Sequence, residues 1–445
     1  MKIYRKLLLL ILLFSAIMPA QASAQTIIRD TEIENYLSEW FAPIFEANGM
    51  SPDQVNVILV QSNELNAFVA GGSNIFLYTG LIQKTEHPGE LIGVMAHELA
   101  HITGGHLVRG RKAQQQASYE SILGTIIGLG AAIASGDSSA AGAGSVAGNS
   151  VATRRFLSTT RSFEASADQA AIRSMEKANM NPEGLLSFMR KLEGQEVLPQ
   201  TQQSEYVRSH PLTRNRVESL KARVTQSTKT NQAFSQEWIE QHKRMKAKLL
   251  GYINPEQISW VFDDRDASVA AIYARAIAAY RQDDLVKSIG YIDQLIEREP
   301  QNAYFYELKG QVLLDFGKVS EAIPQYRKAV ELDSDSGLIR MAMAQAQIQQ
   351  NNVSEAQLKD AIQNLKRAAR EEPRSTRVHR LLATAYGKIK EDSKARLHLA
   401  EEALLQRKYS YAKSQANIAL KGLQADSADA LRARDIVFFV DQNKT

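Results

Sequence analysis

The chain has 445 residues, of which 44% are hydrophobic and none is cysteine. The lack of cysteine excludes a disulfide framework and the lipid-bearing cysteine of a lipoprotein. The formal net charge is +4, and three of the positive charges lie in residues 1–6, so the rest of the chain carries about +1 (four minus three). That balance does not indicate nucleic-acid binding.

The N-terminus has the pattern of a secretory leader. Three basic residues precede an apolar run over 7–18, and small residues occupy positions 22 and 24, ahead of Gln25. The run is shorter than the roughly 20 apolar residues of a transmembrane helix. We therefore predict a cleaved signal peptide over 1–24 and a periplasmic location, which fits the absence of cysteine.

Two short strands are predicted ahead of the main motif. Residues 57–60 are apolar and largely β-branched, and residues 74–78 follow the turn residues Gly71 and Gly72. An exposed strand edge beside a metal-bearing helix can hold an extended peptide by backbone hydrogen bonds. This arrangement favours a peptidase over a small-molecule hydrolase.

The central motif is His97-Glu98-Leu99-Ala100-His101. Histidines four residues apart on a helix project from one face, where both imidazoles can bind the same metal ion. Imidazole suits Zn²⁺, and a catalytic zinc site uses three protein ligands and keeps a fourth position for water. Glu98 lies beside the pair as a general base. The apolar residues 91–96 predict that this helix is buried.

A third metal ligand is expected on another element. His106 is poorly placed, because five residues past His101 corresponds to about 140° around a helix, and we expect His106 at a helix end or on the surface. Glu164 is the better candidate, since it shares a helical face with Asp168 through i,i+4 spacing. One carboxylate would bind the metal while the other accepts a ring N–H from a ligating histidine. The alternative is two solvated acids on an amphipathic helix.

An unusual segment separates these two motifs. Residues 122–134 are apolar apart from Thr125 and glycines, and residues 135–152 are rich in Gly, Ser and Ala. The apolar part is too short to span a bilayer. A buried helix is one alternative, but we expect 122–152 to be a flap over the site or a hairpin in peripheral contact with a membrane, with disorder over 135–152.

His210 and Arg216 are the last candidate site residues. A histidine followed by proline, as in Ser209-His210-Pro211, is often a turn residue. Placed over a metal, His210 would either stabilise the oxyanion of a tetrahedral intermediate or occupy the open coordination position and silence the site. Arg216 would be a substrate or oxyanion contact, or only the exposed start of the helix 217–220.

The order of these motifs resembles the M48 family of zinc metallopeptidases. Residues 65–72 and 75–81 also resemble the strand that leads into the active-site helix of that family. The resemblance implies these roles: one Zn²⁺ per chain held by His97, His101 and Glu164, Glu98 as catalytic base, Asp168 behind the ligands, and His210 and Arg216 lining the site. In the implied reaction the zinc polarises the scissile carbonyl and activates its bound water, and Glu98 carries a proton from that water to the leaving amine.

The second half of the chain is a repeat array. Residues of one unit recur 34 positions earlier, the length of a tetratricopeptide repeat: Gly310, Ala322, Tyr326 and Ala329 correspond to Ala276, Ser288, Ile292 and Leu295. The pattern extends from about 267 to 425, and a plain helical bundle is the alternative. Such repeats stack into a superhelix whose concave face binds peptide or protein.

The sequence thus predicts an α+β zincin-like metallopeptidase domain followed by an all-α tetratricopeptide-repeat solenoid. The expected divisions are a signal peptide over 1–24, the peptidase over 25–225, a connecting helix and linker over 226–265, and the repeats over 266–445.

The combination resembles the β-barrel assembly-enhancing proteases of Gram-negative bacteria. It implies a periplasmic zinc endopeptidase that cleaves misassembled or stalled outer-membrane proteins recruited by the repeats, with their assembly machinery as a further partner. The main alternative is a periplasmic chaperone or assembly adaptor whose zinc site is closed by His210. A third is a peptidase for small secreted peptides.

Overall fold

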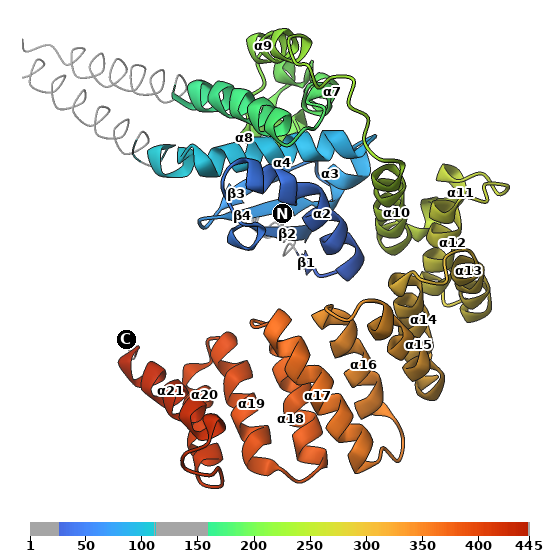
Figure 1. Ribbon diagram of the computed structural model, residues 1–445, viewed down its shortest axis with the longest axis vertical. Helices are drawn as coiled ribbons and strands as arrows, with labels where there is room; N and C mark the ends of the chain where they lie inside the picture. Colours follow the sequence, from blue (N-terminus) through green and yellow to red (C-terminus); the bar gives the residue numbers. More distant parts are fainter. Residues whose placement is uncertain (1–25, 111, 113–158, 444–445) are drawn as a thin grey trace, which may run out of the picture.

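The computed structural model describes residues 26–110, 112 and 159–443 (Figure 1). The predicted signal peptide over 1–24 and the predicted flap or hairpin over 122–152 lie outside these residues. Within the described ranges, no helix combines the length and the apolar character needed to cross a membrane.

The N-terminal half contains a four-stranded sheet. Its strands are β1 (Thr26–Ile28), β2 (Asn56–Gln61), β3 (Ala67–Ala70) and β4 (Asn74–Tyr78), in the spatial order β1-β2-β4-β3. The central strands β2 and β4 are parallel, with Val57 opposite Ile75, and both edge strands pair antiparallel with their neighbours. The two strands predicted from the sequence are β2 and β4.

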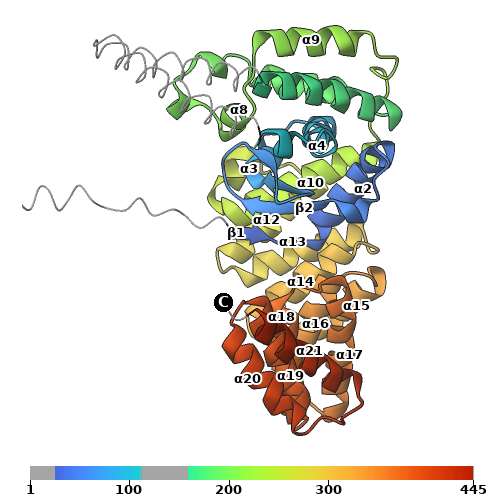
Figure 2. The ribbon, with the colours of Figure 1, turned by 90° about the vertical axis from the view of Figure 1, so that its left-hand side faces the viewer.

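Three helices contribute to the core of this half beside the sheet: α2 (Thr31–Ala47), α3 (Thr79–Lys84) and α4 (Pro88–Thr103). The α4 helix lies between the sheet and the helical residues 159–177 and α7 (Glu183–Lys191), with α9 (Arg214–Thr225) on the far side of these (Figure 2). Because α4 is covered on both sides, its apolar residues on every face are buried, Leu91, Ile92, Val94 and Met95 among them. The predicted burial of this helix is confirmed.

Helix α10 (Gln236–Ile253) links the two halves. It packs against α2, α3 and α4 on one side and against α12 on the other. The indole N–H of the buried Trp40 in α2 donates a 2.6 Å hydrogen bond to Gln241 of α10. After the short helix α11 (Ile258–Val261), the chain enters the repeats.

The solenoid consists of consecutive helix pairs. Its helices are α12 (Val269–Arg281), α13 (Leu285–Arg298), α14 (Ala303–Asp315), α15 (Val319–Leu332), α16 (Gly337–Gln349), α17 (Glu355–Glu371), α18 (Thr376–Lys388), α19 (Asp392–Leu405), α20 (Tyr409–Leu420) and α21 (Ala428–Gln442). Small residues fill the places where they cross: Ala276, Ala322, Ala329, Ala344 and Ala361 are all fully buried. The predicted α+β domain followed by an all-α solenoid is confirmed.

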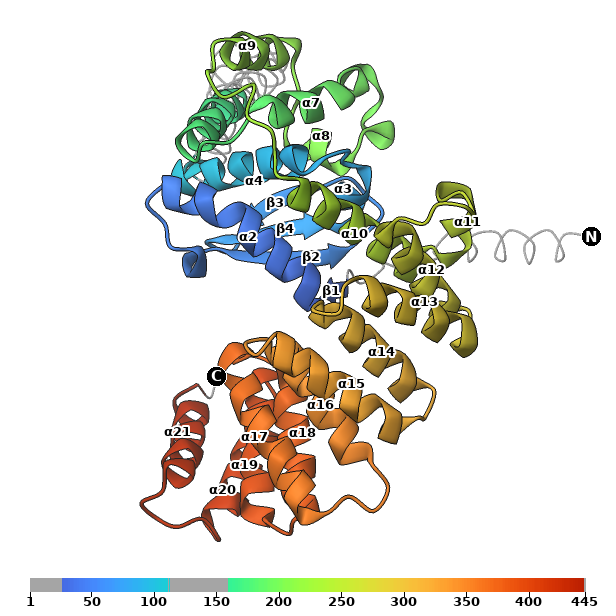
Figure 3. The same cartoon turned by 45° about the vertical axis from the view of Figure 1, so that its right-hand side comes forward.

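The solenoid curves around one side of the N-terminal half, and β1 and the start of α2 face its inner side (Figures 1 and 3). Arg29 donates hydrogen bonds of 2.6 and 2.7 Å to the Glu372 carboxylate, and the hydroxyls of Thr31 and Ser336 lie 3.0 Å apart. A cavity of about 580 Å³ remains between the two parts, and Gln345 is among its lining residues. Part of the inner face of the solenoid is therefore covered by the chain itself.

Candidate metal centre

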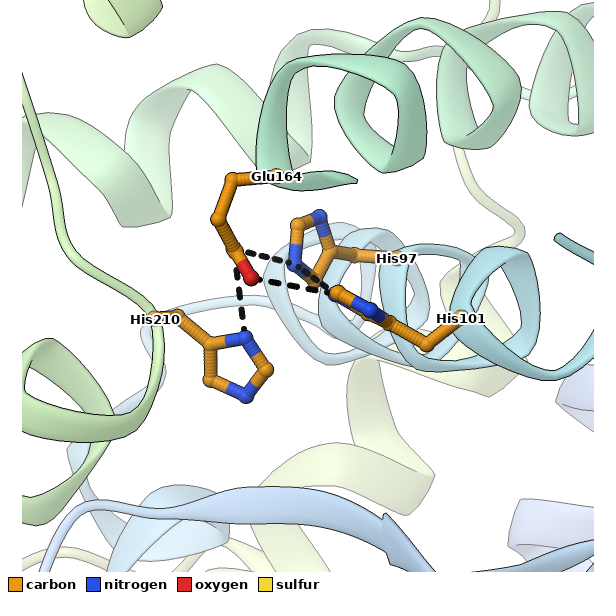
Figure 4. A group of neighbouring side chains, drawn as sticks. All are labelled: His97, His101, Glu164 and His210. Atoms are coloured by element: carbon orange, nitrogen blue, oxygen red, sulfur yellow. Dashed lines mark hydrogen bonds and ion pairs between the residues drawn. The ribbon is translucent and has the colours of Figure 1, made fainter. Parts of the chain in front are cut away.

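His97 and His101 of α4 meet Glu164, which reaches them from helix 159–177 (Figure 4). The Nε2 atoms of the two histidines are 3.1 Å apart. The Glu164 carboxylate lies 3.3 Å from His97 Nε2 and 3.6 Å from His101 Nε2. Together with His210, these residues form a buried group whose potential ligand atoms all lie within 4.8 Å of one another. The structure brings the three predicted metal ligands to one point.

Asp168 and Arg216 lie behind this group. Asp168 Oδ1 is 3.0 Å from His97 Nδ1, the ring nitrogen that does not face Glu164. Arg216 donates two hydrogen bonds of 2.8 Å to Asp168, and its Nη1 is 3.1 Å from Glu164 Oε2. Because Asp168 lies beside Nδ1, Nε2 is the His97 nitrogen that faces Glu164 and His101.

Two alternatives from the sequence are therefore wrong. Glu164 and Asp168 are not solvated acids, because their exposed fractions are 3% and 2%. Arg216 is not the exposed start of a helix, although it lies in the first turn of α9, because it is only 4% exposed and pairs with Asp168. A buried guanidinium needs such partners, since an unpaired buried charge is costly.

Glu98 is fully buried beside the cluster. Neither of its carboxylate oxygens accepts a hydrogen bond from the described residues, although Oε1 lies 3.3 Å from His210 Nε2. Burial raises the pKa of Glu98, and the charges of His210 and His97 oppose that rise. A buried carboxylate with a raised pKa and no hydrogen-bond donor is suited to take a proton from a reacting group.

His210 follows the short helix α8 (Glu205–Ser209) and enters the cluster from a different segment. Its Nδ1 lies 3.2 Å from Glu164 Oε2. The ring of Tyr206 packs against it with centroids 4.7 Å apart, and the buried Tyr206 hydroxyl has no hydrogen-bond partner among the described residues. Sequence reasoning missed Tyr206, and the signal that could have found it is its position one helical turn before His210.

Burial and charge shift the pKa values of the cluster in different directions. Burial, reinforced by His97, lowers the pKa of His101 to about 2, so this ring is neutral. Burial also acts to lower the pKa of His97, but Asp168 and Glu164 outweigh it and raise that pKa to about 9. Burial opposes ionisation of Glu164, yet His210 and His97 hold its pKa well below the ordinary range. The cluster therefore combines an anionic carboxylate with at least one neutral imidazole.

Contacts along α4 fix the position of the motif. The buried Glu90 accepts hydrogen bonds from Ser187 Oγ at 2.6 Å and Lys191 Nζ at 2.7 Å, both on α7. A Cβ at Gly93 would lie 2.6 Å from the backbone nitrogen of Leu185, so α4 and α7 approach backbone to backbone. These contacts hold His97 and His101 on a rigid element, which a metal site requires.

His106 lies at a helix end, as one of its two predicted positions has it, because it begins the helical residues 106–110, but it is not on the surface. It is only 6% exposed, and its Nδ1 lies 3.1 Å from His101 Nδ1. The helical angle between these residues does not apply, because α4 ends at Thr103 and the chain turns at Gly105, where φ is +61°. The expectation of a surface position is therefore wrong.

The residues present fit a divalent transition-metal ion. Two imidazoles and one carboxylate are a donor set of catalytic zinc sites. Each histidine directs Nε2 toward the centre and has its Nδ1 within hydrogen-bond distance of another side chain. A cation at the point where these groups meet would compensate the burial of their polar atoms, which is otherwise costly.

Comparison with known proteins agrees with this geometry. Residues 30–224 match the profile of Peptidase family M48, and residues 273–337 match a tetratricopeptide-repeat profile. Residues 30–224 are an M48 peptidase domain. Within this M48 domain lie the whole buried cluster, Glu98 and the Asp168–Arg216 pair. M48 peptidases are metal-dependent, in agreement with the donor set.

The chain is similar to the Beta-barrel assembly-enhancing protease of Yersinia pestis, with 26% identity over 302 residues, 65% of this chain and 60% of the relative. The protein of that name from Escherichia coli (strain K12) is 25% identical over 307 residues, 67% of this chain and 61% of the relative. The chain thus matches about three fifths of the length of these relatives. Among solved structures, it is similar to MamA MSR-1 C2, with 18% identity, a TM-score of 0.32, and coverage of 38% of this chain and 97% of that chain.

Proposed function

We propose that this chain is a zinc-dependent endopeptidase of the periplasm. One observation carries the proposal: His97, His101 and Glu164 converge beside Glu98, a buried carboxylate that accepts no hydrogen bond from the described residues. The three converging residues would hold one Zn²⁺ per chain. When bound, the ion would supply Lewis-acid polarisation of the scissile carbonyl and activation of a water molecule.

The chain's own residues would transfer the protons. Glu98 accepts a proton from the attacking water on a carboxylate oxygen and then delivers it to the nitrogen of the leaving amine. Burial supports this role, because a raised pKa allows the Glu98 carboxyl to hold the proton between the two steps. Asp168, held by two hydrogen bonds from Arg216, keeps the His97 ring in one orientation throughout.

We further propose that His210 closes the site in the conformation described. Its ring belongs to the same 4.8 Å group as the three proposed ligands and lies where a fourth ligand or a substrate would bind. Hydrolysis of a peptide would then require the segment of α8 and His210 to move away. The other role of His210, as a donor to the oxyanion, makes the opposite prediction for a substitution.

Replacing His210 by alanine separates these two roles. If His210 is a plug, the variant should cleave an unfolded reporter protein faster than the native protein. If His210 stabilises the oxyanion, the rate should fall by about 10²-fold or more. Zinc content measured on the same samples shows whether the change acts through loss of metal.

Outer-membrane proteins are the proposed substrates. The similar proteins of Yersinia pestis and Escherichia coli are named for β-barrel assembly, and the leader pattern over 1–24 supports export to the periplasm. Tetratricopeptide repeats bind peptides and proteins on their concave face. We propose that the solenoid recruits misassembled or stalled outer-membrane proteins, with their assembly machinery as a further partner.

A chaperone or assembly adaptor is the second candidate function. The observation that favours it is the position of His210 within the metal cluster, as expected of a closed zinc site. In this case the solenoid alone would carry the function. The two candidates differ in whether cells need the proton transfer by Glu98.

Glu98→Gln tests both candidates. The purified variant should retain about one zinc per chain and an unchanged circular dichroism spectrum, but its cleavage rate should fall by roughly 10²–10⁴-fold, the contribution typical of a general base. Retained cleavage by protein free of contaminating proteases would contradict the assigned role. In cells, loss of function on this substitution favours the peptidase, and full function favours the adaptor.

The recruiting role can be tested by site-specific crosslinking. Because the chain has no cysteine, a single Gln345→Cys variant can carry a photocrosslinker on the inner side of the solenoid. The matched control is Val286→Cys on α13, an 83% exposed position that does not line the cavity. Outer-membrane proteins should be captured from position 345 and not from 286, and equal capture would contradict recruitment by this face.

A further inference from the structure

A chain of hydrogen bonds leads from His101 to the backbone through His106. His106 Nδ1 lies 3.1 Å from His101 Nδ1, and its other nitrogen, Nε2, lies 3.1 Å from Ser166 Oγ. The Ser166 hydroxyl in turn donates to the carbonyl oxygen of Phe163 at 2.9 Å. The His106 ring also stacks on the Phe163 ring, with centroids 4.7 Å apart and an interplanar angle of 10°.

The direction of each of these hydrogen bonds follows from the last acceptor in the series, the carbonyl oxygen of Phe163. A carbonyl oxygen only accepts, so Ser166 donates its hydroxyl proton to Phe163 and its oxygen accepts from His106 Nε2. A neutral imidazole carries a single N–H, which leaves His106 Nδ1 as an acceptor. His101 must then carry its proton on Nδ1, and its Nε2 lone pair points toward His97 and Glu164.

Two glycines allow His106 to take this position. Gly105 adopts φ of +61°, a left-handed conformation that turns the chain back toward α4. A Cβ at Gly104 would lie 2.5 Å from His106 Nε2, so the absence of a side chain there leaves room for the ring. His106 therefore contacts His101 across a turn between two helical segments, and not along one face of a continuous helix.

We propose that His106 is a positioning residue for the metal ligand His101. It fixes the tautomer and the ring orientation that direct His101 Nε2 to the metal, and this inference rests on the proposed metal site. The two histidine ligands then have unlike supports. His97 is held by an anion, Asp168. His101 is held by the neutral imidazole of His106, which is hydrogen-bonded to the Ser166 hydroxyl and, through it, to a backbone carbonyl.

Two substitutions in the full-length protein separate positioning from packing. His106→Phe keeps a ring that can stack on Phe163 but removes the acceptor for His101. His106→Asn places an amide oxygen near the position of Nδ1, which keeps the acceptor, but it removes the ring. Competition with a chromophoric chelator should show that His106→Phe weakens zinc binding by about 10–100-fold, the usual effect of losing such a support, and that His106→Asn weakens it much less.

A spectroscopic signature and a matched control complete the test. Visible absorption of the Co²⁺-loaded protein should change in His106→Phe and stay close to native in His106→Asn. The control is His242→Phe, which removes another buried histidine whose Nε2 contacts a hydroxyl, that of Thr85 at 2.9 Å, outside the site. This control should bind zinc as the native protein does.

The outcomes distinguish the positioning role from the metal site itself. Native zinc affinity in His106→Phe, or a larger loss in His106→Asn than in His106→Phe, would overturn the positioning role. Failure of the native protein to bind zinc would instead refute the proposed function. If metal-free melting shows that His106→Phe does not fold, His106→Gln provides the same comparison, because its amide matches Nε2 and leaves the Nδ1 position without an acceptor.

Discussion

The metal cluster and the helix crossings of the solenoid are both buried, but the cluster consists of charged and polar residues and the crossings of small apolar ones. The cluster buries charged and polar side chains, all 9% exposed or less: His97, Glu98, His101, Glu164, Asp168, His210 and Arg216. The solenoid instead buries alanines at its helix crossings, and Ala322, Ala329 and Ala361 are fully buried there. One region is held by the pairing of charges and the other by the fit of small side chains.

This difference predicts which substitutions destabilise each region. Removing one partner of a buried ion pair leaves an uncompensated charge, which costs more than the pair contributes. In the solenoid, stability depends on volume, since adding a methyl group between closely packed helices forces them apart. Small substitutions should therefore have unequal effects in the two regions, and for different reasons.

The largest effect is expected for Arg216→Leu. This change leaves Asp168 without its two hydrogen bonds and removes the guanidinium near Glu164, so it should destabilise the M48 domain by about 3–5 kcal/mol. Urea unfolding followed by tryptophan fluorescence reports on this domain, because Trp40 is buried in its core. The control Arg265→Leu removes a 93% exposed arginine and should leave the unfolding curve unchanged. A loss below 1 kcal/mol in Arg216→Leu would contradict the importance of pairing.

Alanine substitutions at two solenoid glycines are expected to change the stability of the solenoid in opposite directions. A Cβ at Gly310 would lie 2.9 Å from the Tyr326 ring, so Gly310→Ala should destabilise the solenoid by about 1–3 kcal/mol. Gly290 on α13 has open space around that position, and Gly290→Ala should stabilise by about 0.5–1 kcal/mol through helix propensity. Unfolding followed by circular dichroism at 222 nm compares the two. Effects of the same sign would show that volume does not govern this region.

The third effect depends on pH and concerns Glu307, a carboxyl in the solenoid that departs from the alanine pattern. Burial raises the pKa of Glu307 from 4.5 to about 8, and Asp30 adds to the rise although Lys248 opposes it. The folded state then binds more protons than the unfolded state between these pH values, so this residue's contribution to stability falls as pH rises from about 4.5 to 8.

Glu307→Gln should remove this pH dependence. The variant should match the native protein near pH 4.5 and exceed its stability at pH 8 by about 4 kcal/mol, which corresponds to a pKa of about 8 in the folded state. Urea unfolding at both pH values measures the difference. The same stability difference at both pH values would mean that Glu307 is ionised normally in the folded protein.

Much of the site was predictable because its signals are local. The spacing of His97 and His101 places both rings on one helix face, and the apolar residues 91–96 predict that the helix is buried. The repeats were predictable for the same reason, since the helix pairs that begin at residues 269, 303 and 337 recur every 34 residues. The helix end predicted for His106 is correct, but its burial against His101 was not predicted, because the helical geometry used for it ends at Thr103.

The sequence by itself determined the helix period, the ligand types and the repeat length, all of which depend on interactions within a few turns of chain. Only the tertiary structure decided which groups meet across long separations. It placed Arg216 against Asp168, brought His210 into the metal cluster, and joined Arg29 to Glu372 across 343 positions. The periodicity of the sequence does not predict such contacts, because they depend on how all the helices pack together and on which buried charges are paired.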